Sequence, residues 1–288
     1  MIPEGYLSGL ERVKETRYPA YCSRGAAERA LKLSKIAEKG YAYLNEFIKA
    51  DYEIPLLVLN EEDWGRYFKD PYGMMVGDNG CIHFPADEEP PTIDVAKPLY
   101  KNSPESLRIK LSSAVRTGGD PFREAMKIYR DTIVVHELTH VFLYNTDNVL
   151  RTRPKDEPEV FGLPWFNEFF CQYTTYAFLR RHVDEYGYEL RIVEQLPEVL
   201  YRGGLSIVKH TMDDLNRLYT GVGMRDYQWF MFRNMWGARE LYEVYGEAFI
   251  GHALKAFEPS NDFLVLNLEA SRSGLGDWFR GWFEKGRL

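Results

Sequence analysis

Residues 132–143 read TIVVHELTHVFL and carry the pattern H-E-x-x-H, from His136 to His140, inside an apolar run. On a helix, side chains four residues apart lie on one face, so the two imidazoles can converge on one metal ion. A catalytic zinc ion takes three protein ligands and keeps one position open for water. Glu137 then lies beside that position, where a carboxylate accepts a proton from the water. The alternative is a core helix whose histidines are satisfied by hydrogen bonds, but burying these groups without a metal is costly.

A second apolar helix with one carboxylate is predicted around residues 163–173, LPWFNEFFCQY. Pro164 suits the first turn of a helix, and apolar residues recur as far as Leu179. Glu168 is the lone carboxylate of this stretch, and a buried charge needs a partner or a metal. With His136 and His140 it completes a set of three ligands. The alternative is a glutamate on the exposed face of the helix.

The two stretches together resemble the gluzincin zinc metallopeptidases of the peptidase MA clan, which have a thermolysin-like catalytic core. The second helix of that family commonly carries a W-x-N-E-G-x-A-like signature. Trp165, Asn167 and Glu168 match it, whereas Phe169 and Cys171 stand where small residues are usual. This departure bears on the packing behind the metal and on the shape of the adjoining pocket. The resemblance is sharp over residues 131–173 and rests on architecture alone before residue 131.

The resemblance implies one zinc ion per chain, held by His136, His140 and Glu168. It implies that Glu137 activates the zinc-bound water as general base, and that the reaction is hydrolysis of a peptide bond in a peptide or protein substrate. One alternative is a catalytically inactive peptide- or protein-binding protein on a metallopeptidase fold, because the bulk of Phe169 would narrow the cleft. Another is a zinc hydrolase that acts on a non-peptide amide.

Gluzincins often stabilise the oxyanion of the reaction with a Tyr or His from the downstream helical region. The candidates in this chain are Tyr227, Tyr219, Tyr201 and His210. Tyr227 is preferred because it begins the run YQWFMF and is followed by Tyr-Gly at 245–246, which is similar to a helix of some bacterial gluzincins. A ligand histidine usually donates its other ring nitrogen to a carboxylate or carbonyl. Asp131 and Asp147 lie near enough in sequence to be such partners.

The predicted fold class is α+β with a zincin-like arrangement. A small N-terminal α/β lobe, residues 1–130, is expected to place a mixed sheet over the zinc-binding helix. A mainly helical lobe, residues 131–288, follows it. In the gluzincin family the edge strand of the sheet pairs with extended substrate, and residues 80–84 are the candidate for that edge.

Local signals predict the elements of the first lobe. Ser23 is a candidate N-cap for a helix over 24–50, and Asn60 opens a short helix. Strands are expected at 55–59 and 81–85, with a Gly-rich turn at 77–80. Residues 87–104 are expected to be loop, and a helix near 121–131 leads into the motif helix. Residues 145–164 are interpreted as a surface loop or, alternatively, a flap over the cleft.

Composition limits the remaining possibilities. The 288 residues are 45% hydrophobic and 15% aromatic, which favours a substantial core in one large domain or two lobes. A net charge of −7 without a basic tract argues against a nucleic-acid partner. No apolar run reaches membrane length, and no signal peptide is visible. Cys22, Cys81 and Cys171 are widely spaced and odd in number, which indicates reduced thiols in a cytoplasmic protein. The aromatic residues within 278–283 are expected to dock the C-terminal helix on the body.

Overall fold

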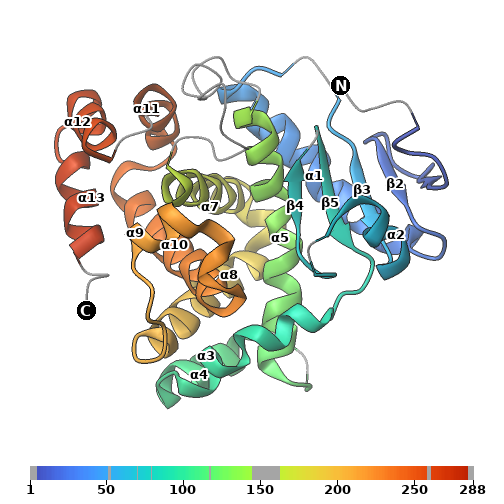
Figure 1. Ribbon diagram of the computed structural model, residues 1–288, viewed down its shortest axis with the longest axis horizontal. Coiled ribbons are helices and arrows are strands. Elements are labelled where there is room, and N and C mark those ends of the chain that lie inside the picture. Colours follow the sequence, from blue (N-terminus) through green and yellow to red (C-terminus); the bar gives the residue numbers. More distant parts are fainter. Residues whose placement is uncertain are drawn as a thin grey trace.

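The structure, a computed structural model, describes residues 5–50, 53–69, 71–78, 80–116, 118–144, 163–257 and 261–284. Helices make up most of this part of the chain, and a small sheet packs on one side of them (Figure 1). The predicted α+β class is confirmed at this level. None of the described helices is long and apolar enough to cross a membrane.

The sheet is mixed and has five strands. They are β1 (Glu11–Arg12), β2 (Ala20–Cys22), β3 (Leu56–Leu59), β4 (Val76–Asp78) and β5 (Cys81–Pro85). Their order is β1-β2-β3-β5-β4, with the middle three parallel and the outer two antiparallel to their neighbours. Leu56 and Val58 face the main core, whereas Leu57 and Leu59 belong to a second cluster on the opposite face. Because both faces are covered, β3 is apolar at every position, and the strands predicted at 55–59 and 81–85 are confirmed.

The edge of the sheet beside the motif helix is β4, so the prediction for residues 80–84 was wrong. Those residues contribute to β5, which pairs with β3 on one side and with β4 on the other. The turn is also shorter than predicted, because residues up to Asp78 are extended and the hairpin closes between Asp78 and Cys81. A three-residue strand is too short to display an alternating pattern in the sequence, which explains the error.

Helix α1 (Ala27–Phe47) confirms the helix expected over 24–50, but Ser23 does not cap it. The N-cap position is Ala26, which makes no side-chain capping bond. The Ser23 hydroxyl instead donates to the Asp63 carboxylate at 2.5 Å and accepts the Asn60 N–H at 3.0 Å. These bonds tie the start of α1 to α2 (Glu61–Tyr67), which Asn60 caps as predicted.

Between the sheet and the motif helix, the chain is more helical than predicted. The elements are η1 (Pro91–Ala96), α3 (Lys97–Asn102), α4 (Glu105–Ala114) and α5 (Pro121–Tyr144). Residues 91–102, which were expected to be loop, are helical, with Pro91 and Pro98 in the first turns where a missing N–H does no harm. Helix α5 runs unbroken from residue 121 through the motif, as predicted, so residue 130 lies inside this helix.

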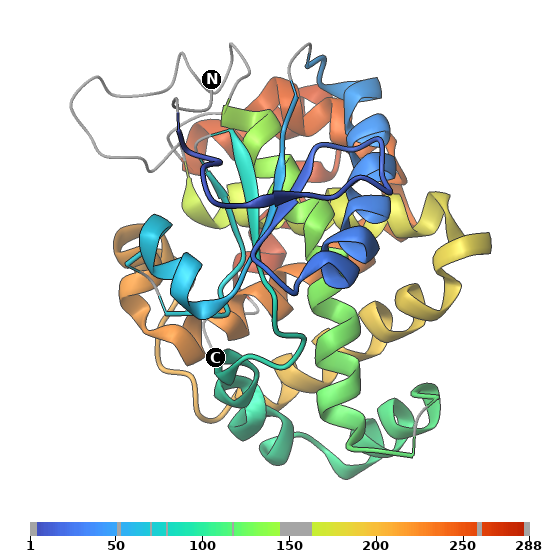
Figure 2. The ribbon, with the colours of Figure 1, turned by 90° about the vertical axis from the view of Figure 1, so that its right-hand side faces the viewer.

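The second half of the described chain is entirely helical. It contains α7 (Pro164–Arg181), α8 (Val183–Gly204), α9 (Met212–Leu218), η2 (Tyr219–Val222), α10 (Met224–Tyr245), α11 (Ala248–Ala256), α12 (Asn261–Ser271) and α13 (Leu275–Glu284). Helix α5 lies between the sheet and the layer formed by α7 and α10 (Figure 1), and Figure 2 shows the sheet in front of α5. The motif helix is therefore covered from both sides.

Helix α13 docks on α7 through aromatic rings, as predicted. The Trp165 ring lies 5.7 Å from Phe279 and 5.8 Å from Trp282, and Phe169 lies 5.9 Å from Trp278. The three cysteines are buried, and none of them forms a disulfide in the described structure. Asp147 and residues 145–162 of the predicted loop or flap lie outside the described residues.

Candidate metal centre

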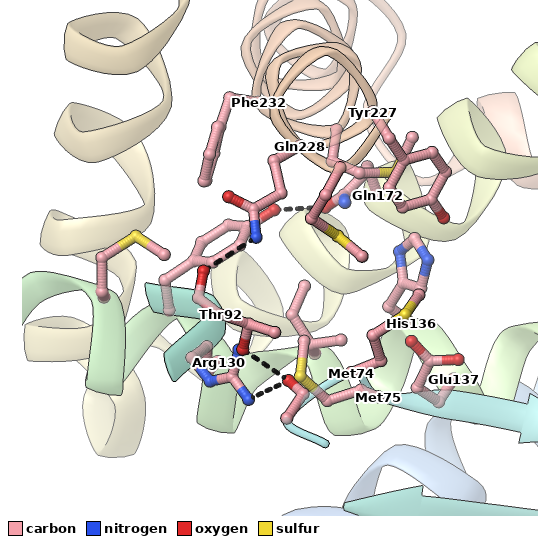
Figure 3. A pocket seen from close by; sticks show the side chains of 16 residues that line it. Met74, Met75, Thr92, Arg130, His136, Glu137, Gln172, Tyr227, Gln228 and Phe232 are labelled. Atoms are coloured by element: carbon pink, nitrogen blue, oxygen red, sulfur yellow. Dashed lines mark hydrogen bonds between the residues drawn. The ribbon is translucent and has the colours of Figure 1, made fainter. Parts of the chain in front are cut away.

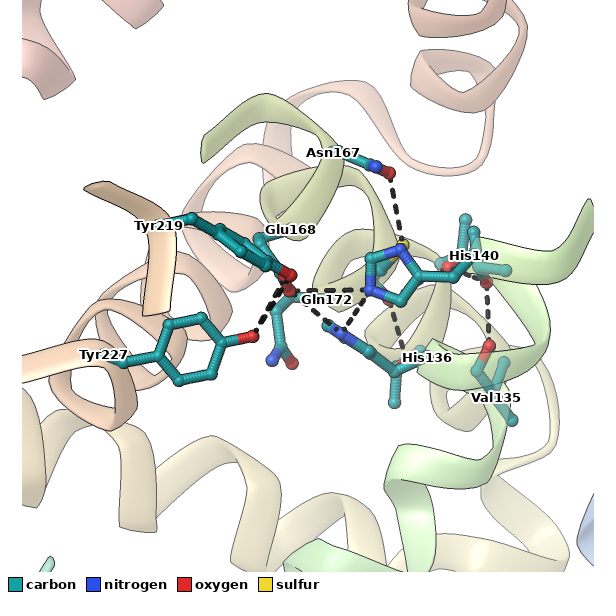
Figure 4. A network of polar contacts seen from close by, with 12 residues as sticks. Val135, His136, His140, Asn167, Glu168, Gln172, Tyr219 and Tyr227 are labelled. Atoms are coloured by element: carbon teal, nitrogen blue, oxygen red, sulfur yellow. Dashed lines mark hydrogen bonds and ion pairs between the residues drawn. The ribbon is translucent and has the colours of Figure 1, made fainter. Parts of the chain in front are cut away.

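Helix α5 places the two histidines of the motif side by side in the interior. His136 and His140 are 4% and 6% exposed, and their Nε2 atoms face each other at 3.1 Å (Figure 4). The apolar residues of α5 are buried around them, which is why the whole motif lies inside the protein. Two ring nitrogens at this distance can share at most one proton. The pair is therefore suited to a third group that contacts both nitrogens.

Helix α7 supplies that third group. Its first residue is Pro164, as predicted, and its Glu168 is 1% exposed. The Oε2 atom of Glu168 lies 3.1 Å from His136 Nε2 and 3.6 Å from His140 Nε2. Ligands bound about 2.05 Å from a tetrahedral zinc ion lie roughly 3.3 Å from one another. The three predicted ligand atoms therefore converge with the spacing of a metal-ligand set.

Cys171 offers a second possible grouping. His136, His140 and Cys171 are all buried, and their potential ligand atoms lie within 4.8 Å of one another, so this group could bind a metal ion. The thiol, however, lies 3.4 Å from His140 Nδ1, the ring nitrogen that does not face His136. Its Sγ also donates to Asn167 Oδ1 at 3.8 Å. Burial raises the pKa of the Cys171 thiol to about 11, so the thiol is protonated at neutral pH in the absence of a metal ion.

The partners of the outer ring nitrogens differ from the sequence expectation. His140 Nδ1 contacts the Cys171 thiol, whereas the buried His136 Nδ1 has no hydrogen-bond partner among the described residues. Asp131 is not a partner of either histidine, because its carboxylate pairs with Arg29 at 2.5 Å and with Lys32 at 2.8 Å. Although it is near the histidines in sequence, Asp131 therefore pairs with basic residues of α1.

Two tyrosines bind the other oxygen of Glu168. Tyr227 donates to Oε1 at 3.0 Å, and Tyr219 donates to the same oxygen through a shorter bond. Tyr219 has φ +48°, the one positive value recorded for a non-glycine residue in the described chain. Such a conformation is strained for a tyrosine and marks a position held by its surroundings. Glu168 is therefore oriented from both sides, with the histidines on Oε2 and the tyrosines on Oε1.

The remaining two candidates lie elsewhere. Tyr201 stacks on Trp229 and Trp236 at 5.6 and 4.8 Å between ring centroids. His210 pairs with Asp226 through its Nδ1 at 2.7 Å. Within the described residues, no contact joins either of them to the histidines or to Glu168. Tyr227 is thus the preferred candidate that the fold brings to the site, and Tyr219 joins it.

Glu137 is buried beside the ligand group, at the edge strand of the sheet. It is 6% exposed, and the N–H of Gly77 in β4 donates to its carboxylate. A Cβ atom at Gly77 would lie 2.3 Å from the main-chain oxygen of Glu137, so only glycine allows β4 to approach α5 this closely. Sequence reasoning placed Gly77 in a turn and missed this role.

The surroundings shift the pKa values of the two buried glutamates in opposite directions. Burial raises the pKa of Glu137, and the nearby histidines offset only part of that shift. Burial also acts to raise the pKa of Glu168, but the charges and hydrogen bonds of His140 and His136 outweigh it and leave the pKa well below the usual value. Pairs of carboxylates separated in this way commonly divide the roles of fixed anion and proton carrier.

A cavity of about 90 Å³ opens beside the site (Figure 3). At one end it is lined by His136 and Glu137, and along α5 it continues past Ile133 and Arg130 to Met126. Tyr227 and neighbouring residues of α10 form another wall, together with Gly73 to Met75 and Thr92. Glu137 is therefore one of the residues that a small group inside the cavity would contact. Arg130 is a further polar residue of this site that sequence reasoning missed.

Comparisons with family models, curated proteins and solved structures give no match to this chain. The function of this chain is therefore inferred from the geometry of its residues.

Proposed function

We propose that this chain is a zinc-dependent peptidase of gluzincin type, with a zincin-like arrangement of the sheet, α5 and α7. The observation that carries the proposal is the convergence of three buried ligand atoms from two helices, at 3.1, 3.1 and 3.6 Å. Without a cation, two imidazoles and a carboxylate would be buried at a considerable energetic cost. One zinc ion per chain compensates that cost.

The proposed ligands are His136, His140 and Glu168, with Cys171 as a supporting residue. The spacing of the three Nε2 and Oε2 atoms favours this set over one that includes the thiol. The contact between Cys171 and His140 Nδ1 suits an orienting role, because ligand histidines are commonly fixed through their second nitrogen. Two nitrogens and one carboxylate oxygen form the ligand set of a catalytic zinc ion, with one position left open.

The chemistry follows from the groups that line the cavity. A bound zinc ion supplies Lewis-acid chemistry, because it lowers the pKa of a water molecule and polarises a carbonyl group. Glu137 accepts a proton at its carboxylate and delivers it to the leaving amine. Tyr219 keeps its bond to Glu168, so Tyr227, which lines the cavity, can turn its hydroxyl toward the substrate carbonyl oxygen. Burial raises the pKa of Tyr227 and keeps that hydroxyl a donor.

Strand β4 is the proposed binding edge for an extended peptide substrate. It is the outer strand of the sheet, and its Gly77 touches Glu137. Main-chain pairing with a sheet edge orients a peptide independently of its sequence. The scissile bond would then lie over Glu137, with the following side chain directed into the cavity.

The bulk of Phe169 would favour the alternative of an inactive binding protein if its ring narrowed the cleft. That ring is fully buried and packs on Phe279 and Trp282 at 5.2 and 5.4 Å. It is not among the residues that line the cavity. The described structure thus gives no obstruction that would favour the inactive protein over the peptidase.

Metal content is the direct test of the proposal. Protein purified without chelator is expected to hold close to one zinc ion per chain by elemental mass spectrometry. His140→Ala, which removes one ligand, should reduce this to near zero, while Cys171→Ala should retain most of it. A chain that takes up no zinc when zinc is offered at neutral pH contradicts the proposal. Zinc lost in Cys171→Ala but kept in a Glu168→Ala variant would establish the other ligand set.

A further inference from the structure

Arg130 is a buried cation that forms no direct ion pair with the described residues. The residue is 4% exposed, and its guanidinium donates only to neutral acceptors, the Gly73 carbonyl at 2.6 Å and Thr92 Oγ1 at 3.3 Å. Burial lowers the pKa of Arg130 to about 10, so it remains charged at neutral pH. Buried charges in proteins are normally paired, because removing an unpaired ion from water is expensive.

Two other buried arginines of the described residues, Arg29 and Arg233, lie against a carboxylate or an aromatic ring. Arg29 pairs with Asp131 at 2.5 Å and with Glu88 at 3.5 Å. Arg233 has no carboxylate partner in the described chain, but it stacks on Trp282 at 4.3 Å and donates to the Trp282 carbonyl. Among the described residues, Arg130 forms neither a direct ion pair nor a contact with an aromatic ring, and the charge of Asp131 acts on it only from a distance. Its acidic neighbour, Asp131, belongs to the network with α1.

The position of Arg130 connects it to the proposed reaction site. Arg130 and Glu137 are seven residues apart on α5, which corresponds to roughly 10 Å along one face of the helix. Both line the same cavity, and Figure 3 shows the guanidinium at the level of Thr92, away from His136. The arginine side chain covers part of the distance between the two residues. The rest, between the guanidinium and the bond at Glu137, can be spanned by a peptide side chain or by one further residue of roughly 3.3 Å.

The walls between these two ends are adaptable. Five of the eight methionines of the chain line the cavity, namely Met74, Met75, Met126, Met224 and Met231. Methionine side chains are flexible and repack around groups of different shape. Beside them, Gln228 donates to the Thr92 carbonyl at 3.1 Å, which fixes the orientation of its amide. The cavity therefore combines an apolar passage with a polar, cationic end.

We propose that this cavity binds a carboxylate group of the substrate through Arg130. The inference rests on the proposed peptidase function for the statement that the ligand is a peptide. The carboxylate is supplied by an acidic side chain directly after the cleaved bond, or by a free C-terminus close to it. A carboxylate matches the planar donor pattern of a guanidinium, and the bond is strengthened by the charge on both partners.

Four peptides with one common apolar sequence before the cleaved bond test the proposal. Two are blocked at both ends and carry either glutamate or glutamine directly after that bond. The other two carry alanine there and end one residue later, in a free carboxylate or a carboxamide. In one of the two pairs, kcat/KM of the zinc-loaded protein is expected to favour the acid at least tenfold, about 1.4 kcal/mol. The pair that shows the preference identifies the source of the carboxylate, and ratios within threefold in both pairs overturn the proposal.

Variants assign the preference to the arginine. Arg130→Met, which suits the methionine-rich walls, should bring the ratio to within threefold of one. Arg130→Lys keeps the charge but loses the paired donors, so it should reduce the ratio at least threefold without reversing it. Arg123→Met on the same helix is the matched control, because Arg123 pairs with Glu89 and Asp94 and does not line the cavity. Unchanged ratios in folded Arg130 variants overturn the assignment.

Binding separates this inference from the proposed function. The dissociation constants of the same peptides are measured by calorimetry on zinc-loaded Glu137→Gln protein, which requires no turnover. A preference for the acid in binding, together with no cleavage by the native chain, supports the carboxylate site and contradicts the peptidase. Cleavage of these peptides without any preference for the acid supports the peptidase and contradicts the carboxylate site. Absence of binding by all four peptides contradicts the inference.

Discussion

Helix α7 is buried on every side, yet its neighbouring residues Glu168 and Phe169 are buried in opposite environments. The Glu168 carboxylate lies among two imidazoles and two tyrosine hydroxyls. The Phe169 ring lies among the aromatic rings of α13 and α11, with Phe279 at 5.2 Å and Phe249 at 6.3 Å. A helix that is apolar all round packs as a core helix, and the side that carries Glu168 departs from that rule.

The difference separates stability from function within one helix. The Phe169 side stabilises the folded state with or without a metal ion, because it buries aromatic surface in dense packing. The Glu168 side is destabilising in the absence of a cation, because its carboxylate and the two imidazoles are taken out of water without the ion that would bind them. Substitutions on the two sides should therefore have effects that depend on the metal in one case and not in the other.

The largest effect is expected from Glu137→Gln, on activity alone. The amide keeps the size of the side chain but cannot take a proton, so kcat should fall by about 10²- to 10⁴-fold. Zinc content and the melting temperature should stay close to the native values, because Glu137 is not a proposed ligand. Peptide cleavage followed by mass spectrometry, with elemental analysis of the same sample, measures both properties.

Glu124→Gln is the matched control for this substitution. Glu124 is also on α5, does not line the cavity, and makes a surface contact with Lys127 at 3.6 Å. Its activity should equal that of the native chain. If Glu137→Gln protein retains more than a tenth of the native kcat, the proton is handled by another group.

The next largest effect is expected from Phe169→Ala, on stability alone. Removing a fully buried ring should lower the free energy of unfolding by about 3–5 kcal/mol. The loss should be the same with and without chelator, because the ring packs on α13 and not on the ligand group. Urea denaturation under both conditions measures it.

Two controls sharpen the comparison. Phe169→Leu keeps most of the apolar contact and should cost clearly less than the alanine variant. Leu266 of α12 is 59% exposed, and Leu266→Ala should change stability by less than about 0.5 kcal/mol. A loss in Phe169→Ala that appears only when zinc is present would show that the two sides of α7 are coupled.

The same contrast explains what the sequence could reveal. The ligand residues His136 and His140 were predictable because their spacing is local, one turn apart on a helix. Glu168 was predictable because a single carboxylate interrupts an apolar run. These patterns are contained within a few residues, so they can be recognised without knowledge of the tertiary structure.

The features that escaped prediction depend on contacts between distant segments. Ser23 has the composition of an N-cap, but Asp63 competes for its hydroxyl across 40 residues of sequence. Gly77 looks like a turn residue until β4 is placed against Glu137. Among the described residues Arg130 has no direct ion pair, and this is visible only once Asp131 is seen to pair with α1. No local pattern encodes such pairings, because each needs the completed fold.

The smallest effect is expected from Tyr219→Phe, on the affinity for zinc. Tyr219 and Tyr227 both donate to Glu168 Oε1, so loss of one hydroxyl leaves the carboxylate partly oriented. Residues that orient a metal ligand typically change affinity by about 10- to 100-fold, and the lower end is expected here because one donor remains. Competition with a chromophoric chelator measures the change.

Tyr227→Phe is the informative counterpart, because it removes the other hydroxyl from the same oxygen. If Tyr227 only orients Glu168, the two variants should weaken zinc binding equally and leave kcat of the zinc-loaded protein equal. If Tyr227 also donates to the substrate carbonyl oxygen, kcat should fall about 10²- to 10³-fold in its variant alone. Equal kcat values at saturating zinc would therefore restrict Tyr227 to the positioning of Glu168. Unequal values would assign the cavity-lining hydroxyl to the reaction itself.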